Sequence, residues 1–166
     1  MLSDLGDIRA VPALIAVLSD ETEVVIRRIA VYTLGQLRDV RAVDALIAQL
    51  RDATDEWVRA NAAWALGQLR DARAFDPLIS ALRDEDWPVR ANATIALSDL
   101  GDSRAIDPLI AMLGDATLHV RANAAMALGR LRDARALQPL RALLADPIPT
   151  VAQQAKQAVA QLEMSR

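Results

Sequence analysis

The sequence predicts an all-α fold, an α-solenoid of five antiparallel helix pairs spanning residues 1–166 as a single repeat array. Three observations indicate this fold class. One block of about 14 residues returns five times, and each copy is followed by a second apolar pattern with helical spacing. Hydrophobic residues make up 53% of the chain but aromatic residues only 3%, so the core must be built from Ala, Leu, Ile and Val.

The repeated block starts at leucines that lie 31 or 32 residues apart. It reads LGDIRAVPALIAVL from Leu5, LRDVRAVDALIAQL from Leu37 and LRDARAFDPLISAL from Leu69. It then reads LGDSRAIDPLIAML from Leu100 and LRDARALQPLRALL from Leu131. A near-constant period over five copies places the repeats at approximately 5–36, 37–68, 69–99, 100–130 and 131–162.

Each repeat carries two helical patterns. The first helix has apolar residues at i, i+3, i+4 and i+7, as in the set Val43, Leu46, Ile47 and Leu50. The second helix has a buried stripe made mostly of alanine, as in the set Val58, Ala62, Ala65, Leu66 and Leu69. Small residues in that stripe let neighbouring helices approach closely.

Short polar side chains precede the predicted helices. Before the first helices these are Asp7, Asp39, Asp71, Asp102 and Asp133. Before the second helices they are Thr22, Thr54, Asp86 and Thr117. Because such side chains accept hydrogen bonds from the free N–H groups of a helix start, we expect them to act as N-caps.

An arginine and an aspartate recur at the same period as the repeat. The arginines begin the second helices: Arg27, Arg59, Arg90 and Arg121. The aspartates lie in the preceding loops: Asp20, Asp52, Asp84 and Asp115. Because an unpaired buried arginine is costly, we predict an Arg–Asp ladder between consecutive repeats. The alternative is that the arginines bind phosphate.

The repeat resembles the HEAT-like repeat of the phycobilisome lyases, and also the artificial α-helical binders built on that pattern. The pattern G-D-x-R-A-x-x-P-L-I-x-x-L is carried by Gly101, Asp102, Arg104, Ala105, Pro108, Leu109, Ile110 and Leu113. Its continuation V-R-x-x-A-A-x-A-L-G is carried by Val120, Arg121, Ala124, Ala125, Ala127, Leu128 and Gly129. The resemblance covers nearly the whole chain and implies a right-handed solenoid.

The chain departs from this family pattern at two kinds of position. Arg38, Arg70 and Arg132 stand where a glycine often ends the second helix, and Ser98 replaces the late glycine of that helix. These changes affect local caps rather than the architecture. Members of the family include chromophore lyases, scaffolds and binding modules, so the fold does not assign a function.

The resemblance implies that the second helices line the concave surface of the array. Stacked repeats turn each helix position into a column, and all three tryptophans and the only tyrosine fall in these columns. A row of large apolar side chains on a groove is typical of a protein-binding surface. The predicted partner-binding residues are Tyr32, Trp57, Asn61, Trp64, Trp87, Asn92, Ile95, Leu118, His119, Asn123 and Met126.

Each of these features has a structural alternative. Trp57 and Trp87, at the starts of their helices, can cover loops instead of binding a partner. The asparagines can bond the backbone of neighbouring helices, and His119 can be a solvated surface residue.

The composition and motifs exclude several functions. With no cysteine and one histidine, the sequence predicts no catalytic residues, no metal site and no cofactor. A net charge of −3 argues against nucleic acid, and no apolar run is long enough for a membrane span. We expect a cytoplasmic, non-enzymatic protein-binding scaffold whose partner is another protein. The alternatives are a bilin lyase subunit or chromophore-handling factor, and a homodimer.

Overall fold

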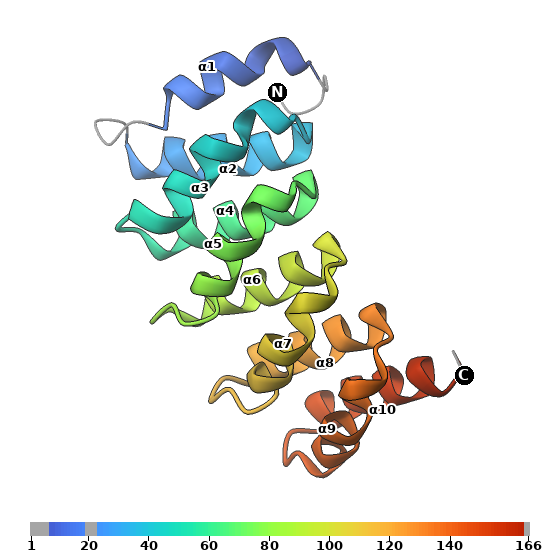
Figure 1. Ribbon diagram of the computed structural model, residues 1–166. Helices are drawn as coiled ribbons and strands as arrows, with labels where there is room; N and C mark the ends of the chain where they lie inside the picture. Colours follow the sequence, from blue (N-terminus) through green and yellow to red (C-terminus); the bar gives the residue numbers. More distant parts are fainter. Residues whose placement is uncertain (1–6, 19–22, 165–166) are drawn as a thin grey trace. The chain divides into compact units, whose positions relative to one another are not determined.

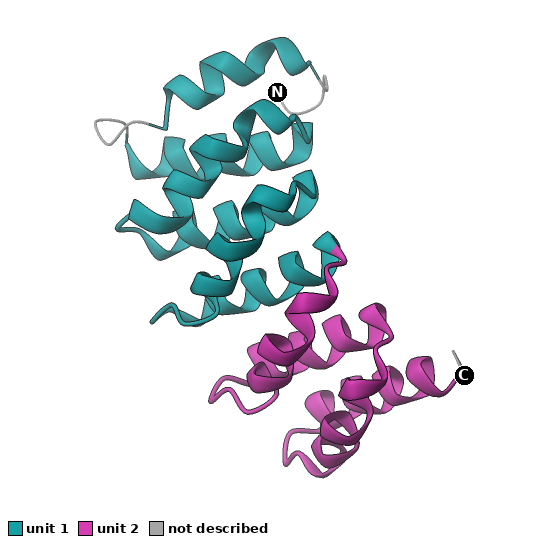
Figure 2. Ribbon diagram, in the orientation of Figure 1, with its two compact units in different colours: residues 1–100 teal, residues 101–166 magenta. Residues whose placement is uncertain are grey.

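The computed structural model describes residues 7–18 and 23–164 (Figure 1). The predictions made at Leu5, Asp20 and Thr22 lie outside the described residues. The chain divides into two compact units, Met1–Leu100 and Gly101–Arg166 (Figure 2). The division falls where the fourth predicted repeat begins. Each unit is a stack of helix pairs, and the single array over 1–166 stays a prediction.

Unit 1 holds three helix pairs in two layers. Short 3₁₀ turns precede the first helices: Ile8–Ala10, Val40–Ala42 and Ala72–Ala74. The first helices are α1 (Val11–Ala16), α3 (Val43–Asp52) and α5 (Phe75–Ala81). The second helices are α2 (Val24–Leu37), α4 (Glu56–Leu69) and α6 (Trp87–Leu100). In this unit α4 packs against α2 on one side and α6 on the other, and all three run in the same direction (Figure 1).

Unit 2 repeats the pattern with two helix pairs. Its first helices are α7 (Ile106–Met112) and α9 (Leu137–Ala142), and its second helices are α8 (Leu118–Leu131) and α10 (Pro149–Glu163). Its 3₁₀ turns are Ser103–Ala105, Ala134–Ala136 and Leu143–Ala145. The described residues of both units therefore form ten α-helices in five pairs and no strand, which confirms the predicted all-α fold class.

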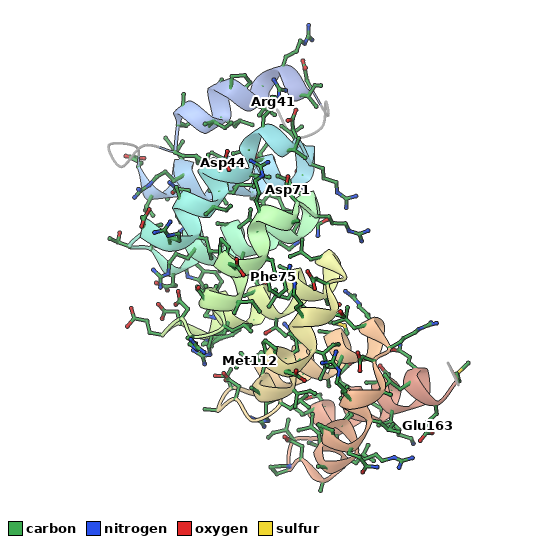
Figure 3. The ribbon with its side chains drawn as sticks, viewed as in Figure 1. Arg41, Asp44, Asp71, Phe75, Met112 and Glu163 are labelled. Carbon is green, nitrogen blue, oxygen red and sulfur yellow. The ribbon has the colours of Figure 1, made fainter. Side chains whose placement is uncertain are left out.

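The predicted caps of the first helices need a correction, because the aspartates cap the 3₁₀ turns that precede these helices. The N-cap of each first α-helix is instead an alanine three residues later, with no side-chain cap bond. Each aspartate side chain accepts a hydrogen bond of 2.9 Å from the backbone N–H two residues later, as Asp39 does from Arg41. The Arg41 guanidinium also pairs with Asp39 at 2.6 Å. Figure 3 labels Arg41 and Asp71, in the segments that lead into α3 and α5, and Asp44, in the first turn of α3.

The caps of α4 and α8 correct the sequence prediction, whereas Asp86 directly precedes α6 as predicted. Thr54 does not cap α4, because Asp55 is the N-cap and accepts from the Val58 N–H at 2.9 Å. Thr117 holds the N-cap position of α8 but makes no side-chain cap bond. Its own N–H instead donates to Asp115 at 2.7 Å. A cap needs the correct register as well as a suitable residue, and the threonine at 54 lies one residue too early.

Glycines late in the second helices allow close approach of the neighbouring second helix. A Cβ atom on Gly67 in α4 would lie 2.7 Å from the Ala96 Cα of α6. A Cβ on Gly35 in α2 would lie 2.6 Å from the Trp64 ring of α4. In unit 2 the matching position, Gly129, faces Ala158 Cα at 3.0 Å. The alanine stripe and these glycines together set the spacing of the second helices.

The arginines that stand where the family pattern has glycine adopt the left-handed backbone conformation that glycine adopts easily. Arg38, Arg70 and Arg132 have φ values of 51°, 53° and 53° and end their helices in the left-handed region. Gly101, which keeps the glycine, has φ 70°. A side chain costs roughly 1–2 kcal/mol in this region, so the three arginines carry local backbone strain.

Candidate functional site

The exposed side of α2, α4 and α6 in unit 1 carries large apolar side chains. We call this surface the second-helix face. On α2, Val25, Ile29 and Tyr32 are 57%, 61% and 45% exposed and lie one helical turn apart. On α4, Trp57 is 44% exposed. Three neighbouring exposed side chains on one helix are not needed for the packing of that helix, so they mark a surface available to a partner.

Two of the predicted binding residues form a stacked aromatic pair across neighbouring helices. The rings of Tyr32 and Trp64 lie 4.8 Å apart between centroids with an interplanar angle of 16°. Trp64 is half-buried, because one edge of its indole lies over Gly35 of α2. The pair therefore joins α2 to α4 while Tyr32 remains open to solvent.

The asparagine column bonds neighbouring helices, as the structural alternative predicted. The Asn92 Nδ2 donates to the backbone oxygen of Ala60 at 2.9 Å, and the Asn61 Nδ2 donates to that of Arg28 at 3.4 Å. Both asparagines are half-buried. Their carboxamides thus tie each second helix to the preceding one, which limits what they can offer to a ligand.

The other predicted binding residues of unit 1, Trp87 and Ile95, lie on α6, the last of its second helices. Trp87, the first residue of α6, is 41% exposed, and Ile95 is half-buried. Pro88, which holds the helix position that Val25 and Trp57 occupy in α2 and α4, is buried. The exposed large apolar side chains of the second-helix face are therefore concentrated on α2, with one exposed tryptophan each on α4 and α6.

In unit 2 the corresponding positions on α8 are less apolar. Leu118, Asn123 and Met126 are half-buried, while His119 is exposed. The next second helix, α10, is coated with exposed polar side chains at Gln153, Lys156 and Gln157. The predicted site residues of unit 2 thus follow the repeat register but present no large exposed aromatic group.

The predicted site omitted two of the most exposed apolar residues, Val25 and Ile29. Their signal was available, because they stand in the same columns as Trp57 and Asn61. The predicted set took the apolar residues Ile95, Leu118 and Met126 from the columns but not Val25 and Ile29, although their exposure makes them strong candidates here.

The arginine ladder has a structural role in both units. The Arg59 guanidinium lies 2.9 Å from Asp84 and 2.8 Å from Asp86, both in the next repeat, and also donates to Ala53 O at 2.9 Å. In unit 2, Arg121 lies 2.8 Å from Asp146. Hydrogen bonds from Arg121 hold the pKa of Asp146 below its ordinary value. These arginines are satisfied by protein acceptors, which supports the ladder over the phosphate-binding alternative.

The described residues provide no grouping that would suggest metal chemistry or membrane insertion. Within residues 7–18 and 23–164, no three His, Asp or Glu side chains gather where they could hold a metal ion. In the same ranges, no helix combines the length and hydropathy of a transmembrane span.

Comparison with known proteins places these features in a family. A family model for HEAT repeats matches residues 1–67, 43–118 and 75–160. Among curated protein sequences, none matches the chain significantly. Among solved structures, the chain is similar to the complex of CpcE and CpcF of phycocyanin lyase from Nostoc sp. PCC7120, with a TM-score of 0.82 and 30% identity. That match covers 93% of this chain but only 65% of the lyase chain.

Designed repeat proteins share the same architecture. A designed armadillo repeat protein in complex with the peptide (KR)4 matches with a TM-score of 0.73 and 24% identity over 93% of this chain and 82% of that chain. Computationally designed armadillo repeat proteins for modular peptide recognition match with a TM-score of 0.71 and 26% identity, over 92% and 82% of the two chains. Because the family model matches well over half of the sequence and the helices follow its paired pattern, the chain belongs to the HEAT-repeat family.

Proposed function

We propose that this chain is a non-enzymatic scaffold that binds another protein through the second-helix face. The observation that carries the proposal is the exposure of Val25, Ile29, Tyr32 and Trp57 on adjacent helices. Aromatic and aliphatic groups of this kind form the anchors of protein interfaces. The stacked Trp64 also favours binding, because its packing on Tyr32 orders the Tyr32 side chain, which would otherwise lose conformational entropy when a partner binds.

The proposal retains the predicted site residues in both units. Asn61, Asn92, Ile95 and Trp87 surround the anchors on α4 and α6. On α8 the same repeat positions are held by Leu118, His119, Asn123 and Met126. These α8 residues are proposed as a secondary contact, because they expose less apolar surface. A cytoplasmic location also belongs to the proposal.

The experiment compares two triple variants as bait. The face variant carries Val25→Ser, Ile29→Ser and Trp57→Ala. The control carries Ile8→Ser, Val40→Ser and Leu144→Ser, which replace equally exposed apolar residues outside the second-helix face. A partner captured by the native chain and the control, but not by the face variant, is purified and its affinity measured by calorimetry. We expect the face variant to bind about tenfold or more weakly.

Two results would contradict this function. Equal affinity of the face variant and the native chain would remove the second-helix face from binding. A stable dimer in sedimentation that dissociates only in the face variant would mean that a second copy of the chain covers the face.

A bilin lyase subunit is the second candidate, and the likeness to the phycocyanin lyase complex favours it. An apolar face with aromatic groups can hold a tetrapyrrole. The match covers 65% of that lyase chain. The rest of the lyase chain has no counterpart in the match, so the activity of the whole lyase is only a proposal for this chain. Titration with a bilin distinguishes the candidates: a stoichiometric shift in bilin absorbance supports the lyase candidate, and an unchanged spectrum contradicts it.

A further inference from the structure

We propose that the second-helix face takes an amphipathic α-helix of the partner, with basic residues along one flank and acidic residues along the other. This inference rests on the proposed function and adds the conformation and charge pattern of the segment bound. Three features of unit 1 carry it: the breadth of the apolar face, the use already made of its asparagines, and the opposite charges along its two edges.

The breadth of the face suits a short helix laid across it. Helices α2, α4 and α6 lie side by side (Figure 1), and packed helices are about 8–10 Å apart. From the axis of α2 to that of α6 the face therefore measures roughly 16–20 Å. A helix rises 1.5 Å per residue, so about 11–14 residues cross the face. Their apolar stripe would meet Ile29, Tyr32 and Trp57 in turn.

The polar groups of the face favour a helix over an extended peptide. An extended peptide brings unpaired main-chain N–H and C=O groups that need partners on the surface that binds it. The two asparagines at the centre of the face already use their Nδ2 groups to bond neighbouring helices. Gln68 accepts from the Arg38 guanidinium at 2.7 Å. The backbone N–H and C=O groups of a helix are hydrogen-bonded within the helix itself, so a bound helix needs only apolar contacts along the face.

The two edges of the face carry opposite charge. Glu23 and Glu56 stand at the edge where α2 and α4 begin. Glu85, before α6, shares a surface pocket with Arg51, so the contrast between the edges is carried by α2 and α4. Arg38 and Arg70, both exposed, stand at the edge where α2 and α4 end. Arg28 lies near the first edge, but its guanidinium is paired with Asp55. A helix with lysines on one flank and glutamates on the other therefore matches both edges at once.

The test uses four capped 14-residue peptides and the full chain. The first peptide has a leucine face with one lysine flank and one glutamate flank. The second has two lysine flanks and the third has two glutamate flanks. The fourth has the composition of the first but contains central prolines that prevent a helix. Binding is followed by tryptophan emission and calorimetry. We expect the mixed-flank helix to bind about fivefold tighter than either single-charge helix, since exposed ion pairs are individually weak.

Charge reversal on the chain sharpens the test. Glu23→Lys with Glu56→Lys should shift the preference to the peptide with two glutamate flanks. The matched control, Asp44→Lys with Asp76→Lys, changes the net charge equally on α3 and α5, in the other layer, and should leave the preference unchanged. The single variants Ile29→Ser and Trp57→Ala should weaken every peptide that uses the face.

The outcomes separate this inference from the proposed function. Tighter binding of the proline peptide, lost in Ile29→Ser, would overturn the helix inference and keep the face as a binding site. Equal binding of the three helical peptides would overturn the charge pattern. Peptide affinities that do not respond to Ile29→Ser or Trp57→Ala would overturn both.

Discussion

Unit 1 and unit 2 are built from the same repeat, yet their second helices expose different surfaces. In unit 1 the exposed positions hold Val25, Ile29, Tyr32 and Trp57. In unit 2 the corresponding region holds His119 on α8 and the polar coat of α10. The buried stripes of the two units are closely alike in residue type. The repeat thus constrains the residue types on the packed side of each helix. The exposed side lies outside that packing, so its residue types can differ between the units.

The largest expected effect concerns the arginine ladder, which is more heavily bonded in unit 1. Arg59→Ala removes a guanidinium that pairs with two aspartates, and it leaves the mostly buried Asp84 without its partner. We expect a loss of about 3 kcal/mol in the free energy of unfolding. Arg121→Ala, which breaks the ion pair with Asp146, should cost about 2 kcal/mol. Urea denaturation checks both, and equal losses would contradict the difference between the units.

A second prediction concerns the spacing of the second helices. Gly67→Ala places a methyl group 2.7 Å from backbone of α6, and we expect a loss of about 2–3 kcal/mol. In unit 2 a Cβ on Gly129 would meet the flexible end of Gln161 at 2.5 Å and backbone only at 3.0 Å, so Gly129→Ala should cost about 1 kcal/mol. The control is Gly114→Ala, whose nearest neighbour is an oxygen at 3.7 Å. A loss in the control as large as that for Gly67 would show that the gap is not the cause.

The helix ends should respond alike in the two units. Arg70→Gly and Arg132→Gly relieve a positive φ, and each should raise the free energy of unfolding by about 1 kcal/mol. The reverse change, Gly101→Ala, should lower it by a similar amount, since its φ is 70° and space is open around it. Thermal denaturation measures the shifts. No gain in either arginine variant would mean that the arginine side chain compensates for the strain.

The exposed apolar residues of unit 1 should matter little for stability. Ile29→Ser removes a side chain that is 61% exposed, so we expect a change within about 0.5 kcal/mol. Trp64→Ala should cost more, because this ring is half-buried and stacked on Tyr32. Chemical denaturation separates the two. A large loss for Ile29→Ser would assign the second-helix face to the core instead of to binding.

The smallest expected effect is on the pH dependence of stability. Hydrogen bonds from the Arg41 side chain, and then from its backbone N–H, lower the pKa of Asp39 to about 2. A carboxyl whose pKa is lowered by folding stabilises the native state above its unfolded pKa, near 3.8. That stability is lost as the pH falls from about 4 towards 2. Asp39→Asn keeps the cap acceptor and should flatten this part of the profile, measured as Tm against pH. An unchanged slope would contradict the role of Asp39.

The sequence predicted the fold more completely than the site. Its period located five helix pairs, but its first-helix aspartates cap the 3₁₀ turns before those helices instead of the α-helices themselves. It placed the N-cap of α4 at Thr54 instead of Asp55, because the residue types before a helix do not define its first residue to within one position. The predicted face residues Tyr32, Trp57 and Trp87 are exposed, but the set omitted Ile29, which is 61% exposed, because the position of a residue in a column does not measure its exposure.

The sequence by itself determined which residues share a column, since the period and the helical spacing require only counting along the chain. Tertiary structure decided how far each member of a column is covered. Tyr32 and Trp64 hold equivalent repeat positions, yet Tyr32 is exposed and Trp64 is half-buried. The difference arises because the indole of Trp64 leans over the preceding second helix at Gly35, whereas Tyr32 lies on α2, the first of the second helices among the described residues. Exposure depends on the distance between helices that are far apart in sequence, and periodicity carries no measure of that distance.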